Sequence, residues 1–245
     1  MKRSMKKGFV LALGAVALLT RIASATPSTH IWAPSTDVQA YGVFHLTHDV
    51  YIPVEGAKTA PITNEGFTVG VIPSEKINME VGFDLINGAT TDATPLYFNA
   101  KMGVPENSLG EGIPALAVGA YAVGTKSDST DYNVLYAKVG KTVPVAGRFS
   151  IGYFLGNEDL LGKDENSGIL LCWERTMSEI SDNLWVAVDY QGSESALGAL
   201  SYGFSWKFAP NTSVILGYDD YNNASLADTY TVQLDIDFDV FSGKK

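Results

Sequence analysis

The stretch Thr229–Val240, TYTVQLDIDFDV, decides the fold. Its apolar residues occupy every second position from Tyr230 to Val240, and Thr, Gln and Asp fill the positions between them. In a helix these carboxylates would be spread around the circumference. A strand instead places all the apolar side chains on one face and all the polar ones on the other. The stretch is therefore predicted to be a two-faced β-strand.

The same alternation recurs along the chain. Clear examples are 77–85, 96–104, 149–155 and 200–208, and clusters of Gly, Pro, Asn, Asp and Ser lie between the alternating segments. Most predicted strands are about ten residues long, which is the length of a tilted membrane-spanning strand. About twelve strands are predicted in all, at 37–52, 64–73, 76–87, 95–105, 112–124, 131–142, 147–156, 167–177, 183–192, 196–208, 212–220 and 228–240.

Residues 1–25 are predicted to be a signal peptide. Basic residues near the N-terminus precede an apolar run of 12 residues, Gly8–Leu19, and Ala23-Ser24-Ala25 supplies the small residues for cleavage after Ala25. The apolar run is shorter than the ~20 residues that a membrane-spanning helix needs. We therefore expect an exported protein in which residues 26–245 form one domain.

Composition excludes several classes of protein. The 46% hydrophobic and 11% aromatic content excludes a disordered chain, and a single Cys excludes an internal disulfide framework. Loss of the signal peptide removes five basic residues and no acidic ones, so the net charge falls from −10 to −15. Such an acidic chain lacks the basic surface that binds phosphates, so nucleic acid is not an expected partner.

Alternation alone does not separate a soluble β-sandwich from a membrane barrel, because the apolar face packs a core in the first and contacts lipid in the second. The export signal, the uniform strand length, the even number of strands and the aromatic residues at strand ends favour the barrel. The aromatic residues expected at the membrane interfaces are Trp173, Trp206, Phe208 and Phe238 at the inner ends, and Tyr51, Tyr153, Tyr190 and Tyr218 at the outer ends.

By this pattern the mature chain resembles a small Gram-negative outer-membrane β-barrel of the porin-like kind. The resemblance implies an all-β fold, a single antiparallel transmembrane β-barrel of about 12 strands. It implies a location in the cell outer membrane. Its implied partners are outer-membrane lipid, small hydrophilic solutes and the barrel-assembly machinery, and a homo-oligomer is compatible with it.

Polar residues of lumen-facing parity predict the chemistry of the interior. Nine of them are acidic and four are basic, an excess that favours cations or neutral solutes over anions. The predicted function is therefore a passive outer-membrane channel for small hydrophilic solutes. The residues expected to line or constrict the pore are Asp49, Glu80, Asp84, Lys101, Lys138, Arg148, Asp189, Asp235 and Asp237.

Three alternatives stay open: a non-conducting barrel with a structural or adhesive role, a soluble exported β-sandwich or lipid-binding barrel, and a barrel hydrolase that uses His45 and Asp49. Enzyme activity is not expected, because no His lies in a predicted outer loop and none follows His48. We expect neither a cofactor nor a metal ion, since His30, His45 and His48 lack the spacing of metal ligands.

Overall fold

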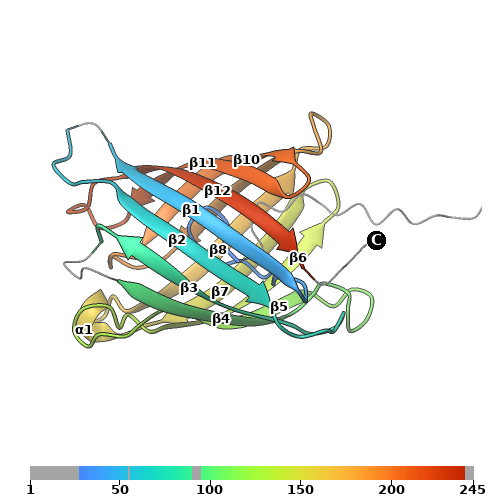
Figure 1. The fold of residues 1–245 in the computed structure, drawn as a ribbon, viewed down its shortest axis with the longest axis horizontal. Coiled ribbons are helices and arrows are strands. Elements are labelled where there is room, and N and C mark those ends of the chain that lie inside the picture. Colours follow the sequence, from blue (N-terminus) through green and yellow to red (C-terminus); the bar gives the residue numbers. More distant parts are fainter. Residues whose placement is uncertain (1–27, 55, 90–94, 241–245) are drawn as a thin grey trace, which may run out of the picture.

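A computed structural model describes residues 28–54, 56–89 and 95–240. Its twelve strands form one closed antiparallel barrel (Figure 1). A single short helix, α1 (Glu158–Leu161), lies between β7 and β8 in the described chain. The strands are β1 (Val43–Pro53), β2 (Ile62–Gly70), β3 (Asn78–Asn87), β4 (Leu96–Val104), β5 (Ala115–Gly124), β6 (Val134–Val143), β7 (Gly147–Leu155), β8 (Ser167–Thr176), β9 (Leu184–Gln191), β10 (Ala199–Ala209), β11 (Thr212–Tyr221) and β12 (Thr229–Asp239).

Each strand pairs with its neighbours in sequence, and the first and last strands close the barrel. The closing pair runs from Val43 opposite Asp239 to Pro53 opposite Thr229. Closure satisfies the backbone groups that an edge strand would expose. The predicted fold class, a single antiparallel barrel of about 12 strands, is confirmed.

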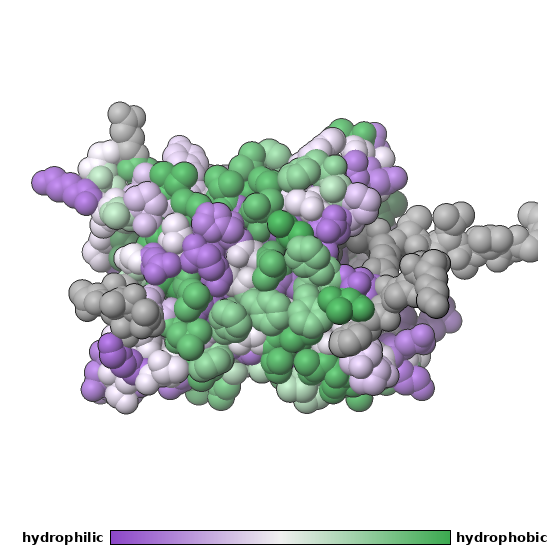
Figure 2. Space-filling view, viewed as in Figure 1, coloured by the Kyte–Doolittle hydropathy of each residue, from purple (hydrophilic) through white to green (hydrophobic). Residues whose placement is uncertain are grey.

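The two faces of the wall have the polarity of a membrane barrel. On β12, Thr231, Gln233 and Asp235 are buried on the inner face, whereas Tyr230 on the outer face is 56% exposed. Figure 2 shows apolar residues over the middle of the barrel wall and hydrophilic residues mostly toward its two ends. A soluble lipid-binding barrel would have the opposite arrangement, so the outer surface is suited to a lipid environment.

The connections differ between the two ends of the barrel. We call the end that carries the connections after β1, β3, β5, β7, β9 and β11 the loop end, and the other end the turn end. The loop end holds residues 156–166 with α1, while residues 210–211 alone join β10 to β11 at the turn end. Longer loops at one end are typical of outer-membrane barrels.

Two sequence expectations concern the N-terminal part of the chain. The predicted signal peptide, including the cleavage site after Ala25, lies outside the described residues. The prediction of a first strand at 37–52 is wrong at its beginning, because β1 starts at Val43 and the backbone of Asp37 and Gln39 bonds to side chains inside the barrel. No helix in the described part of the chain is long and apolar enough to cross a membrane.

Candidate functional site

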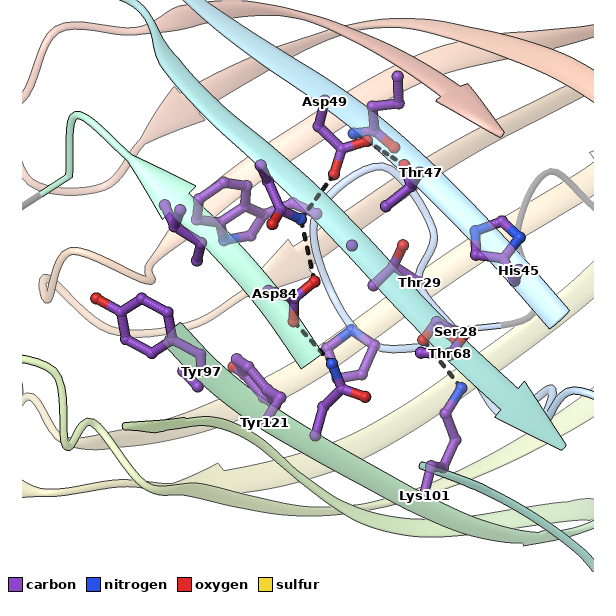
Figure 3. A pocket seen from close by; sticks show the side chains of 18 of the residues that line it. Ser28, Thr29, His45, Thr47, Asp49, Thr68, Asp84, Tyr97, Lys101 and Tyr121 are labelled. Carbon is purple, nitrogen blue, oxygen red and sulfur yellow. Dashed lines mark hydrogen bonds between the residues drawn. The ribbon is translucent and has the colours of Figure 1, made fainter. Parts of the chain in front are cut away.

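Residues 28–42 form what we call the inserted segment, and residues 28–39 of it occupy part of the barrel lumen (Figure 3). The segment is a hairpin in which Thr29 pairs with Pro34 and the His30 amide donates to the Ala33 carbonyl at 2.9 Å. Its end returns to the turn end of the barrel, where Gly42 bonds to β2 and to the residue after β12. The hairpin therefore enters the lumen from the turn end.

The tip of the inserted segment is held by one carboxylate. Asp189 on β9 accepts hydrogen bonds from the backbone amides of Ile31, Trp32 and Ala33 at 2.8, 3.2 and 2.9 Å. On the other side of the hairpin, the Gln233 side chain donates to the Ile31 carbonyl at 2.7 Å. Backbone groups at the tip of a tight turn lack partners within the turn, and here Asp189 and Gln233 of the barrel wall bond to them.

A second set of contacts holds the first and last parts of the inserted segment. Glu80 on β3 accepts from the Ser28 hydroxyl at 2.6 Å and from the Gln39 amide at 2.7 Å. Lys101 on β4 donates to the carbonyls of Ser28 and Asp37. Glu80 and Lys101 also form an ion pair at 3.3 Å, and both are at least 95% buried. A buried pair of this kind is stable only when further hydrogen bonds satisfy it, as they do here.

The opposite wall contributes a third set of contacts. Both terminal nitrogens of Arg148 on β7 bind the Asp37 carboxylate, and Arg148 also pairs with Glu174 on β8. His30 donates to Glu174 at 3.2 Å, while Lys138 donates to the Pro34 carbonyl at 2.8 Å.

The environment of His30 shifts the pKa of its imidazole. Burial lowers the pKa of His30, and the nearby Lys138 ammonium lowers it further, against the opposing effect of Glu174. A neutral imidazole can donate from Nε2 to Glu174 and accept at Nδ1 from Lys138, whose Nζ lies 3.5 Å away. The ring therefore links Glu174 on β8 to Lys138 on β6.

Two apolar residues of the inserted segment pack into the wall. Ile31 is 1% exposed and packs with Trp185 and Ile215. Ala33 is fully buried in a second cluster that reaches from β6 to α1. The wall opposite Ile31 is indented, because a Cβ added to Gly217 would lie 2.8 Å from an Ile31 methyl group. The hairpin is thus packed as well as hydrogen-bonded.

Beside the inserted segment a cavity of about 230 Å³ remains against the β1–β5 wall. At ~30 Å³ per water molecule this holds about seven waters, or one compact solute. Figure 3 shows side chains of this cavity, with Asp49 and Asp84 on neighbouring parts of the wall and the inserted segment behind them.

The polar side of the cavity is a chain of amides and carboxylates. The Asn64 amide nitrogen donates to Asp49 at 3.1 Å and to Asp84 at 3.2 Å, and Asn99 donates to Asp84 at 2.7 Å. Thr47 donates to the other oxygen of Asp49. Gly66 makes room for this arrangement, because a Cβ there would lie 2.8 Å from an Asp84 oxygen.

The other side of the cavity is aromatic and rigid. Trp32 of the inserted segment is fixed by its indole N–H, which donates to the Leu197 carbonyl at 2.8 Å. Its ring makes edge contacts with Tyr51 and Tyr221, at centroid distances of 5.4 and 5.6 Å. Tyr121 also lines the cavity and accepts a hydrogen bond from a Gln191 amide at 2.7 Å.

The structure places all nine predicted pore residues on the inner face, in three groups. Glu80, Lys101, Lys138, Arg148 and Asp189 hold the inserted segment. Asp49 and Asp84 line the cavity. Asp235 and Asp237 flank His45 across the closing strand pair, at 3.5 and 2.9 Å.

The pairing of His45 bears on the hydrolase alternative. His45 contacts two carboxylates of β12, whereas Asp49 bonds to Thr47 and Asn64. The pair proposed for that alternative is therefore engaged elsewhere. The structure also shows no group of three His, Cys, Asp or Glu residues that could hold a metal ion among the residues it describes.

Sequence reasoning missed the inserted segment and misplaced one aromatic residue. Tyr51 was expected at the outer interface but faces the lumen, because it shares the parity of Thr47 and Asp49 on β1. Tyr153 at 54% and Trp206 at 43% exposure do lie on the outer face. The available signal for Tyr51 was its parity, which outweighs its position near a strand end.

A closed antiparallel barrel with an apolar exterior and a charged interior is the fold of a porin-like outer-membrane barrel. Among solved structures the chain is similar to the KdgM porin, at 7% identity and a TM-score of 0.51 over 80% of this chain and 99% of that one. The KdgM porin in complex with disordered oligogalacturonate matches at 6% identity and a TM-score of 0.50, over 80% and 99% of the two chains. No protein-family model and no curated protein matches the sequence. At these identities the likeness shows a shared fold.

Proposed function

We propose that the protein is a passive outer-membrane channel for small hydrophilic solutes with a preference for cations or neutral solutes, and that the inserted segment narrows its lumen. The polarity of the wall carries this proposal. Apolar side chains such as Phe204 and Leu135 are 42% and 60% exposed outside, while charged ones are buried inside around a cavity of about 230 Å³. A barrel of this kind separates lipid from a hydrated passage.

The nine predicted pore residues take two roles in this proposal. Asp49 and Asp84 face the open cavity and set its charge preference. The charged residues that contact the inserted segment fix the width of the passage by holding the hairpin in place. An acidic passage does not suit a polyanion such as the oligogalacturonate bound by the similar KdgM porin.

Planar-bilayer recording of the purified full-length protein tests the channel. We expect stepwise conductance and, in a salt gradient, a reversal potential displaced toward that of the cation. Heat-modifiable migration on a gel provides the control that the barrel is folded in the same sample. A folded barrel without any conductance contradicts the channel proposal.

The inserted segment also favours a second candidate, a non-conducting barrel with a structural or adhesive role. Its tip is buried on both sides, with Ile31 and Ala33 at 1% and 0% exposure. A barrel closed by this segment would not conduct in its native form and would conduct only in variants that loosen the hairpin. A channel narrowed by the segment would conduct in its native form and conduct more in such variants.

The location follows from the same features. We propose that residues 1–25 direct export, that cleavage follows Ala25, and that the mature barrel reaches the outer membrane through the barrel-assembly machinery. The intact mass of the protein from the membrane fraction would then equal that of a chain whose first residue is Thr26. Recovery of an uncleaved chain from that fraction would contradict the cleavage site. Catalysis is not part of this proposal.

A further inference from the structure

The outer, lipid-facing wall of the barrel is hollowed between β6 and β9. We infer that this outer groove binds one zwitterionic phospholipid, with the lipid phosphate on Arg175, the headgroup ammonium on Glu179 and an acyl chain along the groove. The site requires the membrane location of the barrel and does not depend on conductance.

The size and lining of the outer groove suit an acyl chain. Its volume is about 590 Å³, and at ~30 Å³ for each water-sized group this is room for about twenty such groups, the size of one long acyl chain. Outward aliphatic side chains line it, among them Ile151, Leu171 and Val188, which are 56%, 38% and 39% exposed. Phe149 and Trp173, which lie opposite each other on β7 and β8, line it nearer the turn end. The groove is therefore apolar along its length.

Trp173 places one end of the outer groove at the membrane interface. Its indole N–H donates to the Ala146 carbonyl at 2.7 Å, in the turn that joins β6 to β7. Trp side chains at the ends of membrane-spanning strands lie at the level of the lipid headgroups. The short turns of bacterial outer-membrane barrels face the periplasm, so the lipid belongs to the periplasmic leaflet.

Charged groups stand at this end of the outer groove. Arg175 lies two residues beyond Trp173 on the same face of β8 and donates to Glu179 at 2.8 Å. The two side chains are 28% and 48% exposed. Gly147 on the neighbouring strand keeps the space beside them open, because a Cβ there would lie 3.0 Å from both the Arg175 Cβ and the Trp173 Nε1. A guanidinium group has five N–H donors, so the contact with Glu179 uses only part of its fork.

The pair of opposite charges selects the type of headgroup. An Arg fork binds phosphate with two parallel hydrogen bonds, and the Glu179 carboxylate beside it accepts from an ammonium group. A phosphoethanolamine headgroup carries both charges two carbons apart and satisfies both side chains. An anionic glycerol headgroup leaves Glu179 beside a second negative charge, and a choline headgroup has no N–H donor. Lys141, which also lines the groove, is already paired with Glu106 at 2.8 Å.

Native mass spectrometry of the folded, detergent-solubilised full-length protein tests this inference. The probes are phosphatidylethanolamine, phosphatidylcholine and phosphatidylglycerol with identical acyl chains. We expect one saturable adduct of phosphatidylethanolamine, and about tenfold weaker binding of the other two lipids, because each lacks one charge-assisted contact. Heat-modifiable migration on a gel checks that the barrel is folded in each sample.

Two variants test the headgroup contacts. R175Q should weaken the binding of phosphatidylethanolamine about tenfold, through loss of the phosphate contact. E179Q should abolish the preference for phosphatidylethanolamine over phosphatidylcholine. The matched controls are K76Q and E75Q, which remove the same charges from the exposed connection between β2 and β3, outside the groove. Both controls should leave lipid binding unchanged.

A third variant tests the groove itself. L171W fills the groove without touching the charged pair and should weaken the binding of all three lipids. Its control is L135W, at an outward position of β6 that does not line the groove. Equal binding of the three lipids would overturn the inference. Unchanged phosphatidylethanolamine binding in R175Q or in L171W, or a lipid preference that persists in E179Q, would also overturn it.

The outcomes separate the lipid site from the channel proposal. Conductance without a preference for phosphatidylethanolamine refutes the site and leaves the channel intact. Selective lipid binding by a barrel that does not conduct supports the site and refutes the channel.

Discussion

Asp189 should determine how firmly the inserted segment is seated, and the substitution Asp189→Asn tests this. The carboxylate is 1% exposed and accepts three backbone hydrogen bonds, two on one oxygen and one on the other. In the variant an amide NH₂ replaces one oxygen, so at least one backbone N–H faces a donor instead of an acceptor. The remaining hydrogen bonds lose their charge assistance.

The magnitude follows from these contacts. A hydrogen bond to a charged group contributes about 1.5–3 kcal/mol, and an unsatisfied buried donor costs about as much. A loss of about 3 kcal/mol changes the equilibrium between the seated and unseated hairpin roughly a hundredfold. Lys138 adds to the effect, because one of the two nearby carboxylates that offset its buried charge is then gone.

Hydrogen exchange read by mass spectrometry measures this equilibrium directly. Peptides that contain residues 31–33 should exchange about a hundredfold faster in Asp189→Asn, while peptides from the barrel strands should not change. Asp220→Asn on the outer face is the control. Unchanged exchange at the tip would refute the role of Asp189, and equal acceleration in all strands would show a general loss of stability instead.

Three further predictions concern other contacts. Arg148→Lys keeps the charge but loses the two-pronged contact with Asp37, so exchange around Asp37 should rise about tenfold. Gly217→Ala brings a Cβ to within 2.8 Å of Ile31 and should cost about 1–3 kcal/mol, read as a lower temperature of heat-induced gel shift. Burial raises the pKa of Glu106, but the ion pair and hydrogen bonds from β6 outweigh burial and lower it below 4.5. The stabilisation by ionised Glu106 is therefore present above pH 4.5 and is lost as the pH falls through the lowered pKa of the folded protein. Glu106→Gln should abolish this part of the acid dependence of the temperature at which the heat-induced gel shift occurs.

The wall of the barrel could be predicted from the sequence because its rule is local. Alternate residues of a strand face opposite sides, so β12 could be assigned both its conformation and its inner face from twelve consecutive residues. The same rule placed Asp49, Glu80 and Asp189 on the inner face. Their distance from one another in the chain did not matter, because each strand is oriented by its own pattern.

The inserted segment could not be predicted because its contacts are not local. His30 meets Glu174, which is 144 residues away, and Ile31 meets Gln233, which is 202 residues away. Nothing between Ser28 and Gly42 repeats with the period of a strand or a helix. Its conformation is determined by the partners that the wall presents once the barrel has closed.

The same contacts change the meaning of the charged interior. Parity counts every inward carboxylate as part of a channel lining, yet Asp189 is hydrogen-bonded by backbone amides of the inserted segment, and Glu80 by a hydroxyl and an ion pair with Lys101. A carboxylate that faces the open space and has no ion-pair partner acts on a passing solute more strongly than one whose charge is offset by a nearby cation. For the proposed channel we therefore expect the ion preference to depend on Asp49 and Asp84, which the Asn64 amide joins, more than on the excess of acidic residues. Replacing Asp49 or Asp84 by Asn should thus change ion selectivity more than replacing Glu80 or Asp189, which hold the hairpin.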